Sequence, residues 1–537
     1  MYRINQLKLP IEHTKKDLLI RAAKILRTSP DSILSLEIKK RSLDARKKPD
    51  LNYIYAVDVN VKETCERKLE KKLPPQVQKI KKETAFSISV TGEEHLAFRP
   101  VIIGTGPAGL FCAYELSLLG FRPILLERGQ DVDHRQKDVE TFWNNNELNP
   151  ESNVQFGEGG AGTFSDGKLN TMVKDPLGRN RRVLETFVKF GASPSILYEN
   201  KPHIGTDILK TIVKNMREEI ISLGGSVYFH TKFVNFFTDL QGTVCKVEAE
   251  DTITHEHVFF DTSVLVLAIG HSARDTFELL KDRSVSMQPK SFAVGVRIEH
   301  PQTMIDISQY GEKYAGTLPA AAYKLTTQLS NGRGVYTFCM CPGGFVVNAS
   351  SEEGKITVNG MSYSGRDGEN ANSAVIVTIT PDDFGTKDVL SGMEFQRKLE
   401  KAAYVAGKGV IPVQLFSDYC KNIPSQKLGQ VKPQNKGNYA LANLRPIFPD
   451  AIGDSIEEGI KEMGKKIHGF DSDDALLSGV ESRTSSPVRI LRDSKSLEGS
   501  VRGIYPCGEG AGYAGGITSA AMDGIKVAQA IAGKYYP

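Results

Sequence analysis

The sequence predicts an α/β protein in which a parallel-sheet domain is interrupted by a mostly antiparallel β domain and preceded by a small α+β unit. Between residue 99 and about residue 285, short apolar strands alternate with helical segments, which is typical of a buried parallel sheet. Residues 290–440 are richer in Gly, Ser and Thr and show the alternating pattern of antiparallel strands. Residues 1–95 carry a strand and helix pattern of their own.

The N-terminal unit is expected to be a β-α-β-rich domain of the ferredoxin-like type. Its predicted strands are 2–9, 33–40 and 53–61, a helix with Thr14 as N-cap is predicted over 14–26, and a further helix and a linker are predicted within 62–82. Residues 1–99 hold 22 Lys and Arg against 13 Asp and Glu, a net charge of +9, whereas the other 438 residues sum to −5. This imbalance indicates a solvated basic surface, with an anionic partner as the alternative.

The bulk composition limits the class of protein. Hydrophobic residues make up 40% and charged residues 25% of the 537 residues, which is typical of globular domains and argues against disorder. No stretch reaches the ~20 apolar residues that span a bilayer, and no signal-peptide segment is seen, so we expect a cytoplasmic protein. Seven cysteines without a CxxC pair argue against a zinc site or a thioredoxin-type pair, and only Cys339 and Cys341 are close together.

A glycine-rich turn follows the first apolar strand of the parallel domain. Gly104-x-Gly106-x-x-Gly109 comes directly after the strand 101–103, a helix follows, and the next strand ends at Glu127. In such a turn the first glycine makes the bend, the second lets the backbone approach a diphosphate, and the third lets helix and strand pack closely. The helix N-terminus offers N–H groups and a positive dipole end. This pattern predicts a Rossmann-like dinucleotide site.

The acid at the end of the second strand narrows the choice of dinucleotide. Glu127 lies 23 residues after Gly104, at the spacing that lets a carboxylate bind an adenosine ribose. A carboxylate there disfavours a 2′-phosphate, so FAD or NAD is expected rather than NADP. Pro107, Ala108 and Arg128 belong to the same predicted cofactor contacts.

Three later segments favour FAD over NAD. The strand 264–269, followed by Gly270, resembles the strand ending Ala-Thr-Gly in flavoproteins of the two-dinucleotide-binding-fold type, and gives Ala268 and Gly270 as candidates. Gly508-Glu509 after the last strand resembles their Gly-Asp, with a longer acid. Gly516-Ile517 opens a helix, and in such proteins the amides at this point face the flavin pyrimidine ring.

The chain as a whole resembles the bacterial family of uncharacterised FAD-dependent dehydrogenases, within the glutathione-reductase-like flavoprotein superfamily. The segments that carry this resemblance are 157–168, 202–207, 338–344 and 481–489. By analogy with related flavoproteins, Gly160, Ala161 and Gly162 form a loop beside the flavin, and Val234 contacts adenine through its backbone. The resemblance implies one noncovalent FAD, bound by residues 96–285 and 441–537, with residues 286–440 as the substrate domain.

The sequence predicts the reaction less specifically than it predicts the cofactor. Without a second NAD domain or a CxxxxC pair, we expect a small organic substrate to exchange hydride directly with the flavin. Arg483 is a candidate anchor for a carboxylate, His203 a candidate acid or base, and Cys341 and His271 further candidates; for each, a purely structural role is the alternative. The competing functions are a flavin-dependent RNA-modifying enzyme, which would use residues 1–99, and a noncatalytic flavin sensor or scaffold.

Overall fold

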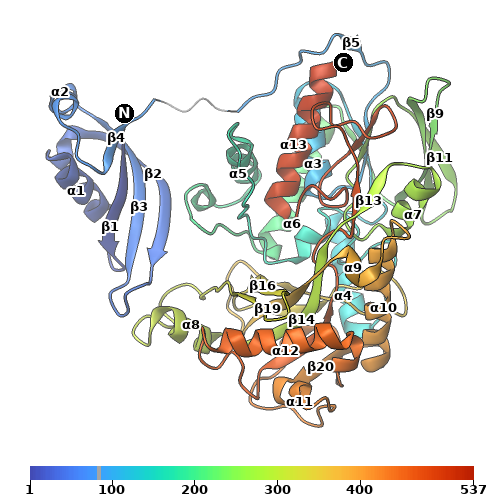
Figure 1. Ribbon diagram of the computed structural model, residues 1–537. Coiled ribbons are helices and arrows are strands. Elements are labelled where there is room, and N and C mark those ends of the chain that lie inside the picture. Colours follow the sequence, from blue (N-terminus) through green and yellow to red (C-terminus); the bar gives the residue numbers. More distant parts are fainter. Residues whose placement is uncertain (82–85) are drawn as a thin grey trace.

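The computed structural model, which describes residues 1–81 and 86–537, has three parts (Figure 1). The N-terminal unit stands to one side of a larger body. In that body the parallel-sheet domain lies above the antiparallel one in the view of Figure 1. Among the described residues, no helix combines the length and the apolar character needed to cross a bilayer.

The N-terminal unit is a four-stranded antiparallel sheet with the order β2-β3-β1-β4 and two helices on one face, the ferredoxin-like arrangement. Its elements are β1 (Tyr2–Pro10), α1 (Lys15–Leu26), β2 (Ile33–Asp44), β3 (Asn52–Val61), α2 (Glu63–Lys71) and β4 (Val77–Lys79). Thr14 caps α1 in a capping box with Asp17, as the sequence predicts. Residue 82, at the end of the predicted 62–82 stretch, lies outside the described residues.

Two sets of contacts hold this unit on the body. An arm after the unit places Phe86, Ile88 and Val90 against the core of the parallel domain, and its strand β5 (Glu94–His95) pairs with the C-terminal β26 (Tyr535–Tyr536). From the unit itself, the Arg41 guanidinium pairs with Glu199, and Arg41 also exchanges backbone hydrogen bonds with 198–200. The unit is therefore docked on the body as well as tethered to it.

The parallel sheet has five strands in the order β25-β12-β6-β7-β8 and is covered on both faces. Its strands are β6 (Val101–Ile103), β7 (Ile124–Leu126), β8 (Ser226–Tyr228), β12 (Leu265–Leu267) and β25 (Ile504–Pro506). One face packs against α3 (Pro107–Leu118), α5 (Arg179–Lys189), α6 (Thr206–Ser222) and α13 (Ile517–Lys534). The other packs against β9 (Thr231–Thr238), β10 (Val244–Asp251) and α7 (Arg274–Asp282), and β11 (His257–Asp261) completes the β9–β10 sheet. Burial on both faces explains why these strands are wholly apolar.

The antiparallel domain is built on a seven-stranded sheet with the order β15-β16-β19-β14-β23-β20-β22. Its strands are β14 (Phe292–Pro301), β15 (Thr326–Gln328), β16 (Gly334–Cys341), β19 (Asn370–Ile379), β20 (Ile411–Leu415), β22 (Tyr439–Leu441) and β23 (Leu476–Glu481). One face packs against α8 (Gln302–Tyr310), α10 (Ser391–Ala406) and α12 (Asp450–Gly464). Side chains alternate along β14, so Val296 and Ile298 point into that core while Arg297 points to the opposite face.

The predicted boundary at residue 440 is too early. The strand β23 pairs with β14 and β20 inside the antiparallel sheet, and α12 covers its face. The strand β23 starts 36 residues after the predicted boundary, and its short sequence LLSGVE has no local pattern that assigns it to the antiparallel sheet. The antiparallel domain therefore extends beyond residue 481, and the chain re-enters the parallel domain after it.

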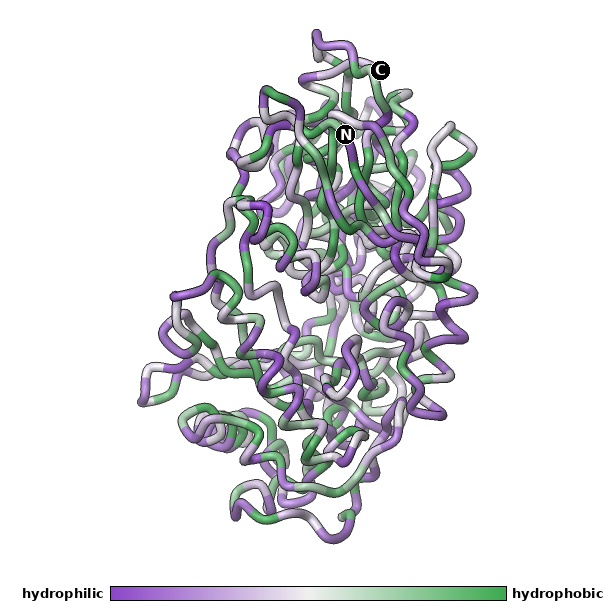
Figure 2. The backbone as a smooth tube through the Cα atoms, turned by 90° about the vertical axis from the view of Figure 1, so that its right-hand side faces the viewer, coloured by the Kyte–Doolittle hydropathy of each residue, from purple (hydrophilic) through white to green (hydrophobic). Residues whose placement is uncertain are grey.

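The remaining elements connect the two domains or lie at their edges. They are α4 (Val132–Asn145), β13 (Met287–Pro289), β17 (Phe345–Asn348), β18 (Val358–Met361), α9 (Pro381–Phe384), α11 (Phe416–Cys420), β21 (Asn435–Lys436) and β24 (Val488–Ile490), with short 3₁₀ turns at Pro30–Ser32, Ala161–Phe164, Pro194–Leu197 and Arg445–Ile447. Apolar stretches run through the interior of the body and polar stretches lie chiefly at its edges (Figure 2). The only tryptophan, Trp143 on α4, donates to the Asn348 carbonyl at 3.0 Å and so joins the two domains.

Candidate cofactor and substrate site

A cavity of about 340 Å³ lies where the carboxyl ends of β6, β12 and β25 meet the antiparallel domain. This is the edge of a parallel sheet at which ligands bind in open α/β folds. Fourteen of the predicted cofactor residues line it: Gly104, Gly106, Pro107, Ala108, Glu127, Arg128, Gly160, Ala161, Gly162, Ala268, Gly270, Glu509, Gly516 and Ile517. Segments some 400 residues apart in the sequence therefore share one site.

Gly104 and Gly109 have the backbone roles that their spacing predicts. Gly104 has a φ of +95°, which favours glycine, and a Cβ on Gly109 would lie 1.9 Å from the Gly104 carbonyl oxygen. Gly109 itself does not line the cavity; it lets α3 pack against the turn. A Cβ on Gly106 would meet only the Gly160 Cα, at 3.8 Å, so this glycine is open toward the cavity.

Two helices begin at the cavity without a side-chain cap. The N-caps of α3 and α13 are Gly106 and Gly516, and neither helix start has a side-chain hydrogen bond. Thr14 caps α1 and Asp131 caps α4, whereas α5, α6 and α7 also begin without a side-chain cap, so what distinguishes α3 and α13 is that both begin at the cavity. The first N–H groups of an uncapped helix lack an intrahelical partner and carry its positive dipole end. Both helices thus present these groups to one cavity, which suits an anionic or electron-rich ligand.

Glu127 is buried at the cavity and binds three backbone segments. One carboxylate oxygen accepts from the Thr105 N–H and hydroxyl, at 3.0 and 2.7 Å, and the other from the N–H groups of Gly129 and Gly157, both at 3.0 Å. These four bonds use the acceptor capacity of a carboxylate. A ribose would therefore have to share or replace one of these hydrogen bonds. Glu127 also holds the glycine turn against the 157–162 loop, a role that the position of Glu127 in the sequence does not indicate.

The adjoining end of the cavity holds a group of paired charges. Arg128 binds Asp275 through two bonds of 3.0 Å, binds Glu151 at 2.6 Å, and lies 4.2 Å from the centre of the Phe156 ring. Lys232 binds Asp275 at 2.9 Å. The two cations hold the pKa of Asp275 well below its usual range, against the opposing effect of burial. Arg128 and Lys232 line the cavity with their charges already balanced.

Arg135 on α4 is a residue of this site that the sequence analysis misses. Its side chain is fully buried and donates to the carbonyls of 153, 154, 157, 158 and 160, at 2.7 to 3.2 Å. Burial lowers the pKa of Arg135 to about 10, which leaves the guanidinium charged at neutral pH. It fixes the loop that closes over Gly106. No local pattern marks it, because its partners are all backbone carbonyls.

Replacing Arg135 by methionine should destabilise the protein by about 3 kcal/mol or more, because several buried carbonyls lose their donor. Urea unfolding followed by Trp143 fluorescence measures the change. As a control, Arg181→Met removes an ion pair whose arginine is 40% exposed, and should cost less than about 1 kcal/mol. Equal effects of the two substitutions would contradict the role given to Arg135.

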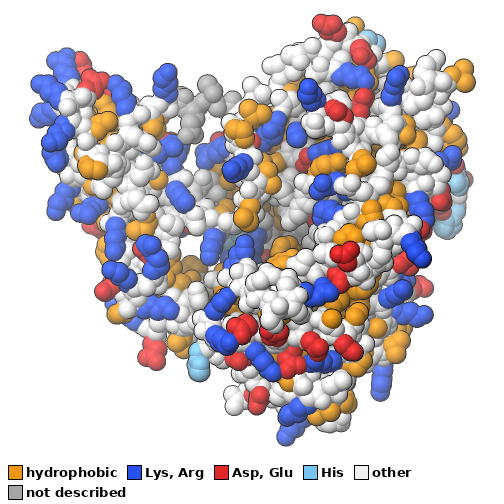
Figure 3. Space-filling view, in the orientation of Figure 1, with side chains coloured by type: hydrophobic (Ala, Val, Ile, Leu, Met, Phe, Trp, Pro, Cys, Tyr) orange, Lys and Arg blue, Asp and Glu red, His pale blue; other side chains and the backbone are white. Residues whose placement is uncertain are grey.

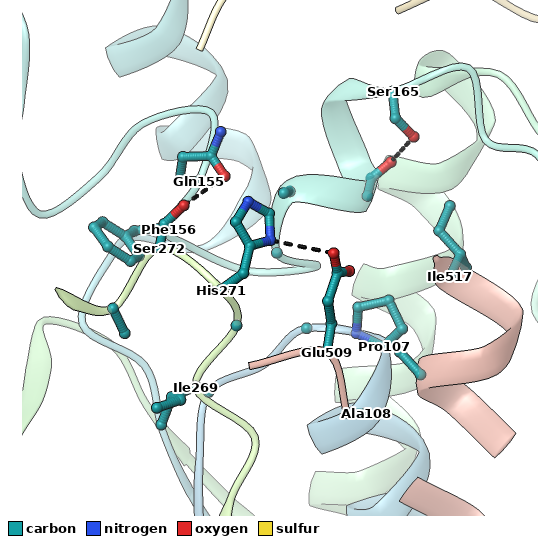
Figure 4. Close-up of a pocket in the computed structure, with 18 of the residues that line it drawn as sticks. Pro107, Ala108, Gln155, Phe156, Ser165, Ile269, His271, Ser272, Glu509 and Ile517 are labelled. Carbon is teal, nitrogen blue, oxygen red and sulfur yellow. Dashed lines mark hydrogen bonds and ion pairs between the residues drawn. The ribbon is translucent and has the colours of Figure 1, made fainter. Parts of the chain in front are cut away.

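One basic and one acidic side chain meet across the middle of the cavity. His271 follows β12 and Glu509 follows β25, and their Nδ1 and Oε1 atoms are 3.4 Å apart (Figure 4). The other ring nitrogen of His271, Nε2, is buried and has no hydrogen-bond partner among the described residues. Next to it, Ser272 donates to Gln155 at 3.1 Å. His271 therefore lies in the cavity wall with one polar atom unused.

Arg483 lines the cavity, but its hydrogen-bonding groups are engaged. It forms two 2.9 Å bonds to the buried carboxylate of Glu400 and donates to Ser272 and Ser351 at 3.1 and 2.5 Å. Arg274 binds the other side of Glu400 at 2.7 and 2.8 Å. The two guanidiniums hold the pKa of Glu400 far below its usual range despite burial. The predicted carboxylate anchor is thus a structural ion pair that joins the two domains.

The comparisons with known proteins agree with this architecture. An uncharacterized protein of Clostridium beijerinckii is 47% identical over 537 residues, 99% of each chain. Residues 291–484 match the family described as FAD-dependent protein, C-terminal domain-like, and residues 1–60 match a domain of unknown function. The chain belongs to the same family as this relative, and its residues 291–484 belong to the family described as FAD-dependent protein, C-terminal domain-like. The matched range ends at 484, which agrees with the structural limit of the antiparallel domain rather than with the predicted one.

Solved flavoproteins are similar only at a coarse level. The flavin-dependent brominase Bmp2 shares 15% identity, with 81% of this chain and 78% of that chain covered and a TM-score of 0.37. The glycerol-3-phosphate dehydrogenase from Bacillus halodurans, complexed with FAD, shares 12% identity, with coverage of 82% and 65% and a TM-score of 0.34. At these scores, nothing about the reaction of this protein follows from the likeness.

Several predicted site residues lie outside the cavity. Val234 does not line it, whereas Thr231, Lys232 and Phe233 do, because β9 turns these residues toward the site. Gly508 does not line the cavity either, and a Cβ at this position would come within 2.6 Å of the Ala108 Cβ. Its N–H donates to Asp523 on α13 at 2.8 Å.

Two of the catalytic candidates are also placed elsewhere. The Nε2 atom of His203 lies 3.4 Å from the Ser364 carbonyl oxygen, and burial together with the charge of Arg366 lowers the pKa of His203. The Cys341 thiol is buried, donates to the Cys339 carbonyl at 3.2 Å, and has a pKa raised by burial to about 11. Neither residue lines the cavity.

Proposed function

We propose that this protein binds one FAD noncovalently in the cavity and acts as an FAD-dependent oxidoreductase on a small organic substrate. The observation that carries the proposal is the pair of uncapped helix starts, at Gly106 and Gly516, that open on one cavity. The first suits the diphosphate of a dinucleotide, and the second suits the electron-rich edge of a flavin. Membership of the FAD-dependent family supports the identity of the dinucleotide.

The residues present fit this cofactor. Added Cβ atoms on Gly270, Gly515 and Gly516 would meet nothing within 4 Å, so the cavity has space at these positions for the large planar ring of a flavin. Gly106 and Gly160 approach each other closely, since a Cβ on Gly160 would lie 3.0 Å from the Gly106 Cα, and both line the cavity, so a diphosphate there could approach bare backbone. When bound, FAD supplies hydride-transfer chemistry. The protein would orient it through the amides at the starts of α3 and α13.

The antiparallel domain completes the cavity from the opposite side. It contributes Phe338 and Cys339 from β16, Asn359 from β18 and Glu481 from β23. A lid built on a sheet rather than on a loop keeps a substrate in a fixed orientation and excludes water. Since no CxxxxC pair exists in the sequence, we expect the substrate to exchange hydride with the flavin directly.

The test is anaerobic absorbance spectroscopy of the FAD-loaded full chain. NADH, NADPH and fractionated metabolite pools are added in turn while the flavin band is followed. Bleaching by an organic metabolite, reversed by an electron acceptor, is the expected result. A flavin band that no reductant or metabolite changes would contradict the proposed activity and favour a noncatalytic sensor or scaffold. Bleaching only with an RNA fraction would favour an RNA-modifying enzyme.

A further inference from the structure

The cavity has a second end, away from the glycine turn, where the two domains meet. There the segment 166–170 of the parallel domain faces Phe338, Cys339 and Asn359 of the antiparallel domain. Thr518 on α13 donates to the Leu169 carbonyl at 2.9 Å, so this end lies next to the α13 start. If FAD binds as proposed, this is where a substrate would lie, and the inference below rests on that function.

Lys168 is the cation of this end that, among the described residues, has only a long ion pair and no hydrogen bond to a carboxylate. Its nearest carboxylate is Asp166, with the Lys168 Nζ at 3.8 Å, beyond hydrogen-bond distance. Asp166 is already bound by the Arg366 guanidinium and by the Ser362 hydroxyl. One carboxylate therefore faces two cations. The side chain of Lys168 is about one-third exposed (35%), which leaves its ammonium accessible.

The other cations that line the cavity within the described part of the chain are all neutralised at hydrogen-bond distance. Arg128 binds Asp275 and Glu151, Lys232 binds Asp275, and Arg483 binds Glu400. Behind the Lys168 end, the buried Arg297 is neutralised by Glu481 at 2.8 Å. Counting Lys168, Arg366 and Arg297 against Asp166 and Glu481 leaves an excess of one positive charge at this end.

We propose that Lys168 binds a carboxylate of the substrate, so that the protein acts on an organic acid. An excess of one positive charge matches a monoanionic carboxylate better than a phosphate dianion. Phe338 and Cys339 line the same end and offer apolar surface to the rest of the substrate, and the Asn359 side chain adds an amide beside it. A lysine on a short segment against α13 thus sets the chemical class of the substrate.

The charge of the N-terminal unit agrees with an anionic substrate. Figure 3 shows Lys and Arg side chains gathered over the N-terminal unit, beside a hollow between that unit and the body. Residues 1–99 carry a net charge of +9. Positive charge on a protein surface raises the local concentration of anions and their rate of association.

The test uses benzoate and its neutral isostere benzamide as probes, because both present a ring to the apolar wall and only one carries a charge. Titration calorimetry is run on the full chain, with and without FAD. We expect benzoate to bind and benzamide to bind at least about tenfold more weakly. Lys168→Met should weaken benzoate binding by about tenfold or more, and Lys168→Arg should retain most of it. Phenyl phosphate should bind no more tightly than benzoate.

The control substitution is Lys174→Met, which removes an exposed lysine from the following loop, outside the cavity lining. It should change neither benzoate nor FAD affinity. The FAD affinity of Lys168→Met should stay within about twofold of the wild type. If benzoate does not bind, or binds equally well to Lys168→Met, the proposal is overturned. If the substitution instead weakens FAD binding, Lys168 serves the cofactor and the proposal is likewise overturned. A chain that binds benzoate but no FAD would contradict the proposed function and not this inference.

Discussion

Replacing Gly106 by alanine is expected to leave the protein folded and to lower its affinity for FAD about 100-fold, or ~2.8 kcal/mol at 1.4 kcal/mol per tenfold. The backbone of Gly106 has a φ of −70° and a ψ of 179°, which alanine adopts without strain. The new Cβ would meet no protein atom closer than 3.8 Å. It would point into the space through which a diphosphate must approach the backbone.

Equilibrium titration with FAD, together with thermal unfolding of the flavin-free protein, measures the two parts of this prediction. The matched control is Gly533→Ala on α13, where an added Cβ also meets nothing within 4 Å and which lies outside the cavity lining. That substitution should keep FAD affinity and raise stability slightly, because alanine favours a helix. A Gly106→Ala protein with wild-type FAD affinity would show that the diphosphate does not lie at this turn.

Replacing Glu400 by glutamine is expected to lower the free energy of unfolding by about 3–5 kcal/mol, because it leaves two buried guanidiniums without their shared carboxylate. Glu400 is fully buried and lies between Arg274 of the parallel domain and Arg483. Loss of this pair removes a link between the domains as well as a charge. Urea unfolding followed by Trp143 fluorescence reports on the same boundary.

The pH dependence of this effect has a definite sign. Glu400 has a pKa below its ordinary value in the folded protein, so its contribution is fully present above the unfolded pKa of about 4.3 and is lost as the pH falls toward the folded pKa. The difference between the wild type and Glu400→Gln should therefore be largest near pH 7 and shrink below about pH 4.

The control for Glu400 is Glu394→Gln on the same helix. Glu394 is 53% exposed and pairs with Arg397 at 2.6 Å, so its replacement should cost less than about 1 kcal/mol. If Glu400→Gln were as mild as this control, the buried network around Arg483 would not be the strong interdomain link described above.

Local sequence patterns were sufficient for the parts of the fold that depend on neighbouring residues. The strand and turn through Gly104 and Gly109 have the predicted form, because the positive φ of Gly104 and the close approach of Gly109 to Gly104 are set within a few residues. The cap of α1 at Thr14 is of the same kind. The boundary of the antiparallel domain was missed because the pairing of β23 with β14 joins segments about 180 residues apart.

The chemistry of the site depended on contacts that no local pattern encodes. Glu400 becomes an ion-pair partner only because α10 brings it between Arg274 and Arg483. Lys168 is recognised as a cation without a hydrogen-bonded carboxylate only because the structure shows Asp166 bound to Arg366. Residue type and spacing therefore predict a cofactor cradle, whereas the balance of charges around it requires the three-dimensional structure.

Titration of FAD into the flavin-free full-length protein is the most direct test of the central claim. The account predicts one site per chain, with a dissociation constant in the micromolar range or below and a bound flavin spectrum. A folded protein, intact by its unfolding transition, that binds no FAD at millimolar concentration would contradict it.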